Sequence, residues 1–175
     1  MTYTVRIADT GDYQAVAQVH VASWQQAYRG LVADAFLESI DPELWAHRYE
    51  ARSDDASTML LAERDQRVIG MVRFGPDRHR AYAGEIYALY VTPGEQRGGV
   101  GSALLNAALQ HLPQPIVQLW CAAGNSQAQS FYERHGFAAD GADDDYVVGE
   151  CVVPIKRYVL ERTGEPGPSP RRPAV

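Results

Sequence analysis

The stretch Gln96-Arg97-Gly98-Gly99-Val100-Gly101 carries the most information about this chain. The apolar run Glu85 to Val91 precedes it and is typical of a buried strand, which Thr92-Pro93 closes. The segment Ser102 to Leu109 follows it and favours a helix. A glycine-rich turn between a strand and a helix brings free backbone N–H groups and the positive end of a helix dipole to one point. We therefore predict an anion site here, and a pyrophosphate is the anion that fits it best.

Other glycine-rich turns differ from this one in ways that matter for function. No Gly-Lys-Ser/Thr follows the glycines, so the turn is not a Walker loop. The G-x-G-x-x-G spacing of a dinucleotide fingerprint is absent, and no βαβ repeat starts the chain. A tight turn that binds no ligand stays open as the alternative, because short motifs also match by chance.

Length and composition indicate a single globular domain. The chain has 175 residues, of which 46% are hydrophobic and 22% are charged. Its formal net charge of -6 argues against a nucleic-acid partner, and no apolar run reaches the length of a membrane span. The N-terminal residues lack a signal-peptide core, so we expect a cytoplasmic protein. Cys121 and Cys151 have no metal-ligand spacing, so we expect reduced core thiols and no metal.

The order of elements predicts a mixed α+β domain over residues 1–162. We expect a strand, two helical regions, three strands, a helix, a strand, a helix and two closing strands. The first helix should run from about Tyr13 to about Tyr28, and Asp41-Pro42 interrupts the second helical region. The closing strands flank an expected acidic loop from Asp140 to Asp145. Residues 163–175 are rich in Gly, Pro and Arg and are predicted to be a disordered tail.

Three motifs in this order resemble the GNAT superfamily of acetyl-CoA-dependent N-acetyltransferases. Gln96-x-x-Gly99-x-Gly101 fits the Q/R-x-x-G-x-G/A pyrophosphate loop of that superfamily. The strand Ala88 to Val91 with Thr92-Pro93 matches the strand that pairs with the cofactor arm. Asn125 and the segment FYERHGF, residues 131–137, are similar to the N-x(6)-Y and F-Y-x-x-x-G-F signatures. The motifs cover residues 85–137, and the order of elements extends the resemblance to about Leu160.

The resemblance implies a GNAT-like, mostly antiparallel, twisted sheet of about seven strands, flanked by about four helices. This sheet splays between strands four and five, and the pantetheine arm of coenzyme A fills the gap. The implied cofactor-binding residues are Leu89, Tyr90 and Val91 on the strand, Gln96, Arg97, Gly98, Gly99, Val100, Gly101 and Ser102 in the loop, and Asn125 and Tyr132 beyond it. The N–H group of Val91 would polarise the thioester carbonyl. Asn125 is equally well explained as the N-cap of the following helix.

Tyr132 and Glu85 are the catalytic candidates. Tyr132 resembles the family's general acid, which protonates the leaving thiolate, and a core aromatic is the alternative. Glu85 stands eleven residues before Gln96, where histone-type members carry a catalytic glutamate. Strand alternation would place it on one face with Leu89 and Val91, and a solvated charge at the start of a strand is its alternative. The glutamate that other members carry five residues before the pantetheine Asn is replaced here by Trp120, so that version of the mechanism is absent.

The acceptor side is the least defined part of the sequence. Trp24, Tyr28 and Phe36 fall where the family walls its acceptor pocket, although their helical spacing equally fits a core. The carboxylates of Asp140 to Asp145 would steer a cationic amine or form a solvated surface. We expect acetyl transfer from acetyl-CoA to a primary amine of a small molecule or peptide, by direct attack in a ternary complex, with a homodimer left open. A non-catalytic acyl-CoA-binding or sensor protein of the same fold is the alternative.

Overall fold

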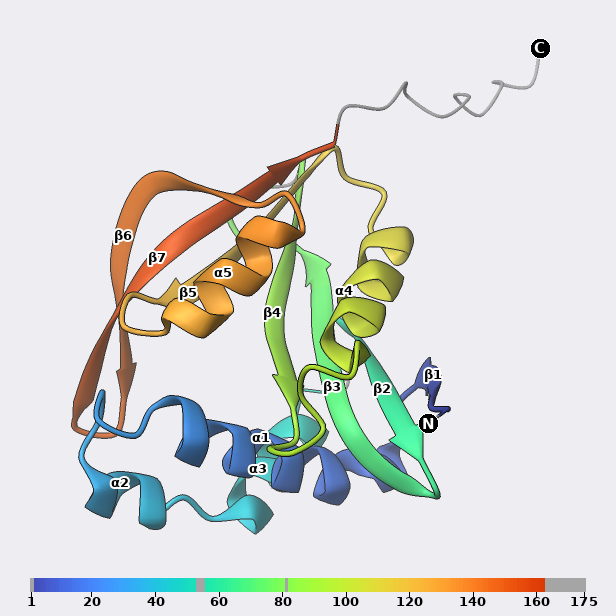
Figure 1. Ribbon diagram of the computed structural model, residues 1–175, viewed down its shortest axis with the longest axis vertical. Coiled ribbons are helices and arrows are strands. Elements are labelled where there is room, and N and C mark those ends of the chain that lie inside the picture. Colours follow the sequence, from blue (N-terminus) through green and yellow to red (C-terminus); the bar gives the residue numbers. More distant parts are fainter. Residues whose placement is uncertain (1, 53–55, 81, 163–175) are drawn as a thin grey trace.

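The computed structural model describes residues 2–52, 56–80 and 82–162, which form one seven-stranded sheet with helices on both faces (Figure 1). The predicted tail, residues 163–175, lies outside the described residues. The elements in chain order are β1 (Thr4–Ile7), a 3-10 turn (Thr10–Asp12), α1 (Tyr13–Ala27), α2 (Asp34–Glu38), α3 (Pro42–Glu50), β2 (Thr58–Arg64), β3 (Arg67–Pro76), β4 (Ala83–Val91), α4 (Val100–His111), β5 (Ile116–Ala122), α5 (Ser126–Arg134), β6 (Ala138–Val148) and β7 (Cys151–Glu161).

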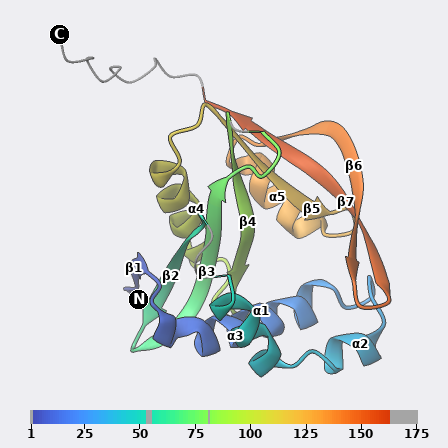
Figure 2. The same cartoon turned by 180° about the vertical axis from the view of Figure 1, so that it is seen from behind.

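The sheet has the order β1-β2-β3-β4-β5-β7-β6 and confirms the predicted fold class. Only the central pair β4–β5 is parallel, since α4 carries the chain back between these two strands. The other five pairs are antiparallel. Seen from behind, α1 and α3 cross the lower part of the sheet (Figure 2). They pack on the face opposite to the one that α4 covers. Among the helices that the structure describes, none is both long and apolar enough to cross a membrane.

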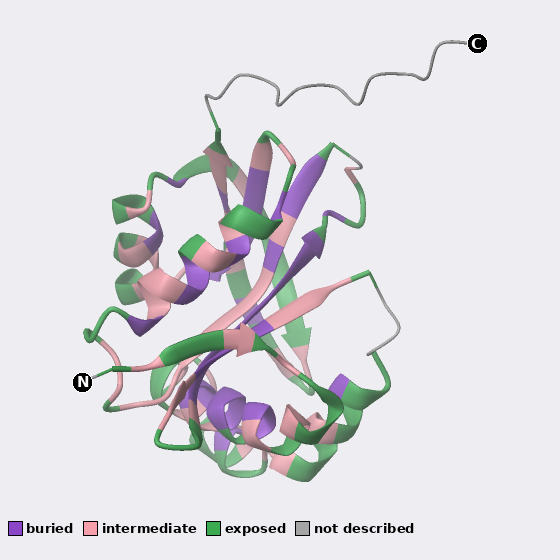
Figure 3. Ribbon diagram, turned by 90° about the vertical axis from the view of Figure 1, so that its right-hand side faces the viewer, coloured by how far each residue is buried: buried purple, intermediate pink, exposed green. Residues whose placement is uncertain are grey.

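Two hydrophobic clusters pack against the two faces of the sheet. Figure 3 shows the buried residues, in purple, along the strands and on parts of the helices. The larger cluster joins the sheet to α4 and α5, and Leu104, Leu105 and Tyr132 belong to it. The smaller one joins the sheet to α1 and α3 through Val16, Val19 and Tyr49. A cofactor or substrate near the middle of the sheet therefore meets a different set of helices on each face.

Two sequence predictions need changes. The second helical region is two separate helices, α2 and α3, because Asp41 caps a new helix with Pro42 at its first position; the Asp41 carboxylate accepts from the Glu43 amide at 2.9 Å. The expected loop from Asp140 to Asp145 is wrong. These residues belong to β6, which pairs with β7 and turns only after Val148. Pairing across the ribbon, with a register shift between Ala139 and Asp143, overrides the turn-like composition of this segment.

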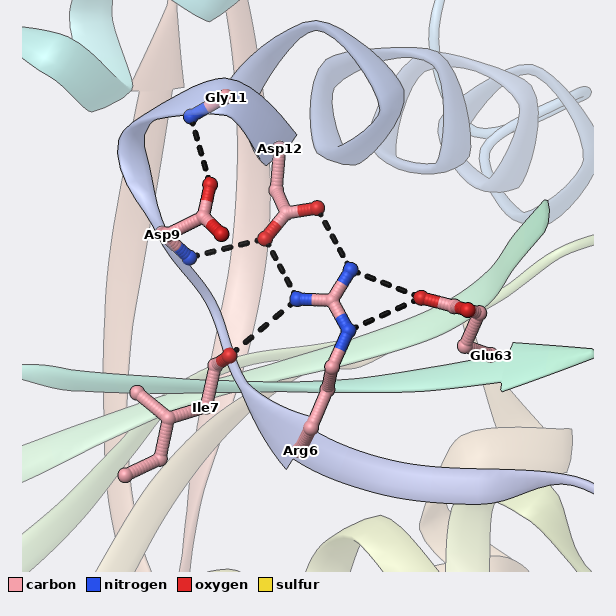
Figure 4. A network of polar contacts seen from close by, with 6 residues as sticks. All are labelled: Arg6, Ile7, Asp9, Gly11, Asp12 and Glu63. Atoms are coloured by element: carbon pink, nitrogen blue, oxygen red, sulfur yellow. Dashed lines mark hydrogen bonds and ion pairs between the residues drawn. The ribbon is translucent and has the colours of Figure 1, made fainter. Parts of the chain in front are cut away.

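An ion-pair network fastens β1 to the start of α1 and to β2 (Figure 4). The Arg6 guanidinium donates to both carboxylate oxygens of Asp12, at 2.7 and 2.8 Å, and its Nε donates to Glu63 at 2.9 Å. Asp12 also accepts from the backbone amide of Asp9 at 2.8 Å and so closes a capping box. The Arg6 guanidinium holds the pKa of the Asp12 carboxyl below its usual range.

We expect Asp12→Asn to lower the free energy of unfolding by about 1 kcal/mol at pH 7, which is a fall of roughly 2–4 °C in Tm. Asparagine keeps an oxygen for the Asp9 amide, and it removes the charge together with one of the two oxygens that accept from Arg6. Because the pKa of Asp12 is depressed in the folded protein, its contribution is full above the pKa of the unfolded chain and is lost as the pH falls through the folded pKa. Thermal unfolding at pH 7 and below pH 4 measures this. The difference from wild type should shrink at the lower pH, and the exposed Glu150→Gln should show no difference at either.

Candidate functional site

A gap opens between the two central strands, and it is visible between β4 and β5 in Figure 1. The parallel pairing covers only Ala83 to Ile86 on β4 and Ile116 to Leu119 on β5. Both strands continue beyond this point, β4 to Val91 and β5 to Ala122, without pairing to one another. The predicted splay between strands four and five is confirmed. The backbone edges of residues 87–91 and 120–122 that face each other have no strand between them.

A β-bulge at Tyr87 marks the point where β4 leaves β5. In the register with β3, Arg73 lies opposite Ala88 and the next residue, Phe74, lies opposite Ile86, so Tyr87 is the extra residue. A bulge bends its strand and increases the local twist, which accounts for the divergence.

The bulge also corrects the expectation that Glu85 shares a face with Leu89 and Val91. Leu89 and Val91 pack with Ile86 in the cluster under α4. Glu85 precedes Ile86 and therefore points to the other face, where Ala88 and Tyr90 pack with α1 and α3. The alternation of side chains along a regular strand predicts the wrong face for Glu85, because the extra residue Tyr87 shifts the alternation by one position.

Backbone groups of β4 line the gap. The amide of Thr92 donates to the Ile69 carbonyl on β3 at 2.9 Å. Successive peptide groups of a strand point to opposite edges, so the N–H groups of Leu89 and Val91 point away from β3 and into the gap, whereas that of Tyr90 points to β3. The Val91 carbonyl also faces the gap, and there it accepts from Ser23 Oγ at 3.2 Å and Gln96 Nε2 at 3.3 Å.

The glycine-rich loop forms an open N-terminus for α4. Gly99 is its N-cap in the left-handed region at φ 83°, with no side chain capping the helix, and Arg97 also has a positive φ of 63°. The first amides of α4 lack acceptors within the helix by geometry. The loop therefore presents several N–H groups at the positive end of a helix dipole, as an anion requires.

Three glutamines connect this loop to the helices on either side of the gap. Gln96 Nε2 donates to Gln26 of α1 at 3.0 Å, and Gln127 of α5 donates to Gln96 Oε1 at 3.3 Å. Sequence reasoning had found Gln96 but had missed Gln26, Gln127 and Ser23. All three are joined to the site by contacts across long sequence separations, and no local motif marks them.

Asn125 lies at the end of β5 and is the N-cap of α5. Its Oδ1 accepts from the Ala128 amide at 3.0 Å. The capping role that was expected as an alternative is therefore present in this structure. Capping uses only the oxygen, and a carboxamide has two N–H donors on its nitrogen.

Tyr132 is on the inner side of α5 and is 9% exposed. Its ring makes edge contacts with Phe131 and Phe137, at centroid distances of 5.2 and 5.9 Å. Burial raises the pKa of Tyr132 well above its ordinary value, and the neighbouring Cys121 and Tyr28 add to the rise. The phenol is thus fully protonated at neutral pH, next to Cys121 in the part of β5 that pairs with β7 but not with β4. Burial likewise raises the pKa of Cys121, to about 11, so its thiol is not a ready nucleophile.

Glu85 occupies the end of β4 away from the loop. Burial raises the pKa of its carboxyl, Asp77 raises it further, and Arg78 and a hydrogen bond from Gln118 oppose the rise. Gln118 is opposite Glu85 in the parallel register and is 4% exposed. A carboxylate with a raised pKa is suited to accept a proton, which is the property the sequence prediction required.

An aromatic cluster lies across the gap from α5. Trp24 is its centre: the ring stacks on Tyr28 at 4.3 Å, meets Tyr146 of β6 edge-on at 6.0 Å, and donates through Nε1 to the Tyr90 hydroxyl at 3.0 Å. Trp24 is 2% exposed and is a core residue, whereas Tyr146 is 39% exposed. Phe36 contacts the β6–β7 turn at Gly149 instead of this cluster. Burial raises the pKa of Tyr28 to about 12, so the cluster is uncharged.

The acidic residues of β6 lie beside the C-terminal end of β5. A groove there is lined by Ala123, Asp143, Asp144, Asp145, Pro154, Ile155 and Lys156. Asp140 is outside it and pairs with Arg157 at 2.7 Å. Only part of the acidic segment therefore has its charge available to steer a cation.

The model of the acetyltransferase (GNAT) family matches residues 20–137, which include the second half of α1, the bulged strand, the loop and α5. The chain belongs to the GNAT family. It is 36% identical over 167 residues to the probable N-acetyltransferase Rv2775 of Mycobacterium tuberculosis, covering 93% of this chain and 96% of that protein.

Solved GNAT structures share the fold at lower identity. The PaiA N-acetyltransferase of Thermoplasma acidophilum, in complex with coenzyme A, superimposes with a TM-score of 0.71 at 21% identity, covering 92% of this chain and 99% of that one. YncA of Salmonella typhimurium, with its cofactor acetyl-CoA, gives a TM-score of 0.69 at 21% identity over 97% and 99% of the two chains. At this identity the likeness shows a common fold.

Proposed function

We propose that this GNAT protein transfers the acetyl group of acetyl-CoA to a primary amine by direct attack. The splayed strands support this proposal most strongly, because they leave the Leu89 and Val91 N–H groups facing a gap that ends at an anion-binding loop. The pantetheine arm would lie along β4 in the gap, and the pyrophosphate would bind the amides of residues 96–102. Leu89, Val91, the loop and Asn125 remain in the proposed cofactor site, whereas the Tyr90 N–H points to β3 and its side chain packs with α1 and α3.

Two groups of the chain would act on the thioester. The Val91 N–H, directed into the gap, would stabilise negative charge on the thioester oxygen as the amine attacks the carbonyl carbon. When the C–S bond breaks, the Tyr132 hydroxyl would protonate the leaving thiolate and regain a proton from water. Direct transfer is favoured over an acetyl-cysteine intermediate, because the raised pKa of Cys121 keeps that thiol protonated.

Glu85 is proposed as the group that takes the proton from the amine, through a chain of water molecules, because it lies six residues from Val91 along β4. We expect Glu85→Gln to lower kcat/KM about tenfold to a hundredfold. The base acts as carboxylate, so wild-type activity rises as the pH rises through its elevated pKa, and this ionisation should vanish from the acidic limb in the variant. A pH profile of kcat/KM tests the role against Glu161→Gln, an exposed carboxylate at the end of β7. An unchanged acidic limb would leave water alone as the base.

An acceptor screen tests the function itself. The purified protein is mixed with acetyl-CoA and a panel of small primary amines and N-terminal peptides, and free coenzyme A thiol is followed. Thiol release with one class of amine, together with acetylated product by mass spectrometry, supports the proposal. Binding of acetyl-CoA without turnover of any amine would favour the non-catalytic sensor.

A further inference from the structure

His135 holds the side chain of Ser102 at the start of α4. The hydroxyl oxygen of Ser102 is 3.0 Å from His135 Nε2, and the other ring nitrogen, Nδ1, is 2.8 Å from the Phe131 carbonyl. Ser102 is the third residue of α4, in the first turn that follows the glycine loop. His135 ends α5 as its C-cap. The pair therefore links the C-terminus of one helix to the anion-binding N-terminus of the other.

The two contacts fix where the protons lie. A carbonyl oxygen only accepts, so Nδ1 carries a hydrogen in every state of the ring. In the neutral ring Nε2 is then a bare acceptor, and the Ser102 hydroxyl must donate to it, which turns its proton toward His135. In the charged ring Nε2 donates to Ser102 Oγ, and the hydroxyl proton is released for another acceptor.

We propose that binding of the coenzyme A pyrophosphate protonates His135 and so turns the Ser102 hydroxyl into a donor to the phosphate. This inference rests on the proposed function, because it requires the pyrophosphate at the loop. The neutral pair would present oxygen lone pairs to an anion, whereas the charged pair presents a hydroxyl proton backed by a cation. His135 is thus a positioning residue for the cofactor that sequence reasoning had missed, although it stands inside the FYERHGF motif.

The surroundings of His135 allow this change. Its Nδ1 is directed at the carbonyl end of α5, and its Nε2 is directed at the first turn of α4. Phe131 is the aromatic neighbour, at a centroid distance of 4.4 Å. The nearest charged residues in sequence are Glu133, which hydrogen-bonds Tyr158, and Arg134. Arg97 is in the loop itself, and no ion pair with His135 is recorded in the described part of the chain.

Calorimetric titration with dephospho-CoA tests the proposal. This ligand lacks the 3′-phosphate, so its pyrophosphate takes up no proton in the neutral range, and any proton taken up on binding belongs to the protein. Titrations in two buffers of different ionisation enthalpy near pH 7 should show net proton uptake. The affinity should rise about threefold to tenfold from pH 8 to pH 6, where imidazole changes charge.

Two variants and one matched control separate this role from a structural one. His135→Gln supplies a permanent N–H donor to Ser102, so it should bind with an affinity within about threefold of wild type at pH 6, without proton uptake or pH dependence. Ser102→Ala should weaken binding and reduce the uptake. His111→Gln is the control, because His111 makes the same Nδ1 contact, 2.8 Å from the Ala107 carbonyl, at the far end of α4. It should keep the full wild-type uptake.

The outcomes distinguish the inference from the proposed function. Tight binding without proton uptake in the wild type overturns the inference and leaves the cofactor assignment standing. Equal uptake in wild type and His135→Gln also overturns it, since the proton then belongs to another group. Failure of both dephospho-CoA and acetyl-CoA to bind overturns both.

Discussion

Replacement of Tyr132 by phenylalanine is expected to lower kcat by about 10²- to 10³-fold while leaving the affinity for acetyl-CoA nearly unchanged. The hydroxyl is the only atom removed, and its ring neighbours Phe131 and Phe137 keep their contacts. Burial raises the pKa of Tyr132, so the phenol is protonated throughout the range in which an amine is nucleophilic. The loss should therefore persist from neutral to mildly alkaline pH.

Steady-state kinetics and equilibrium binding of acetyl-CoA measure the two halves of this expectation. Tyr158→Phe is the control, because Tyr158 is a buried tyrosine of the same cluster and its hydroxyl is hydrogen-bonded to Glu133. It should affect Tm more than kcat. Wild-type turnover in Tyr132→Phe would overturn the acid role. The thiolate would then leave unprotonated or take its proton from water.

The sequence predicts the fold well where the elements that form the site are neighbours in the chain. The strand from Glu85 to Val91, the glycine turn and the helix after it lie close together in the chain, so their motif also gives their arrangement. Two of the corrections concern the pairing of strands. The bulge at Tyr87 depends on the register with β3, and the strand character of Asp140 to Asp145 depends on β7. Neither partner is identified by local propensity, because pairing energy comes from the neighbouring strand.

The residues of the candidate site also differ in whether a local sequence motif predicts them. Gln96 and Tyr132 stand in recognisable motifs, whereas Ser23 and Gln26 reach the site from α1, about seventy positions earlier in the chain. Their residue types are ordinary for a helix surface, and only the packing of α1 against the end of β4 gives them a partner. The cofactor loop is therefore supported by the helix that carries the aromatic cluster.

Replacement of Gly99 by valine is expected to weaken coenzyme A binding about a hundredfold, the cost of two lost hydrogen bonds to a charged group. Gly99 has φ 83°, a conformation that a β-branched residue adopts only with strain. The strain should rotate the peptide groups on either side of it and so misdirect the amides that face the pyrophosphate. A Cβ at this position meets only the Tyr3 hydroxyl, at 3.6 Å, so backbone conformation and not crowding is the cause.

Gly101→Ala provides the matched control two residues further on. Gly101 is inside the first turn of α4, and a Cβ there meets Phe131 at 3.4 Å and Val91 at 3.6 Å, which are ordinary contacts. Alanine has no conflict with a helical backbone, so binding should stay within about threefold of wild type. Calorimetry with coenzyme A measures both variants, and Tm shows that each is folded. Equal affinities for Gly99→Val and wild type would mean that the loop amides do not hold the pyrophosphate, because the left-handed turn is what directs them.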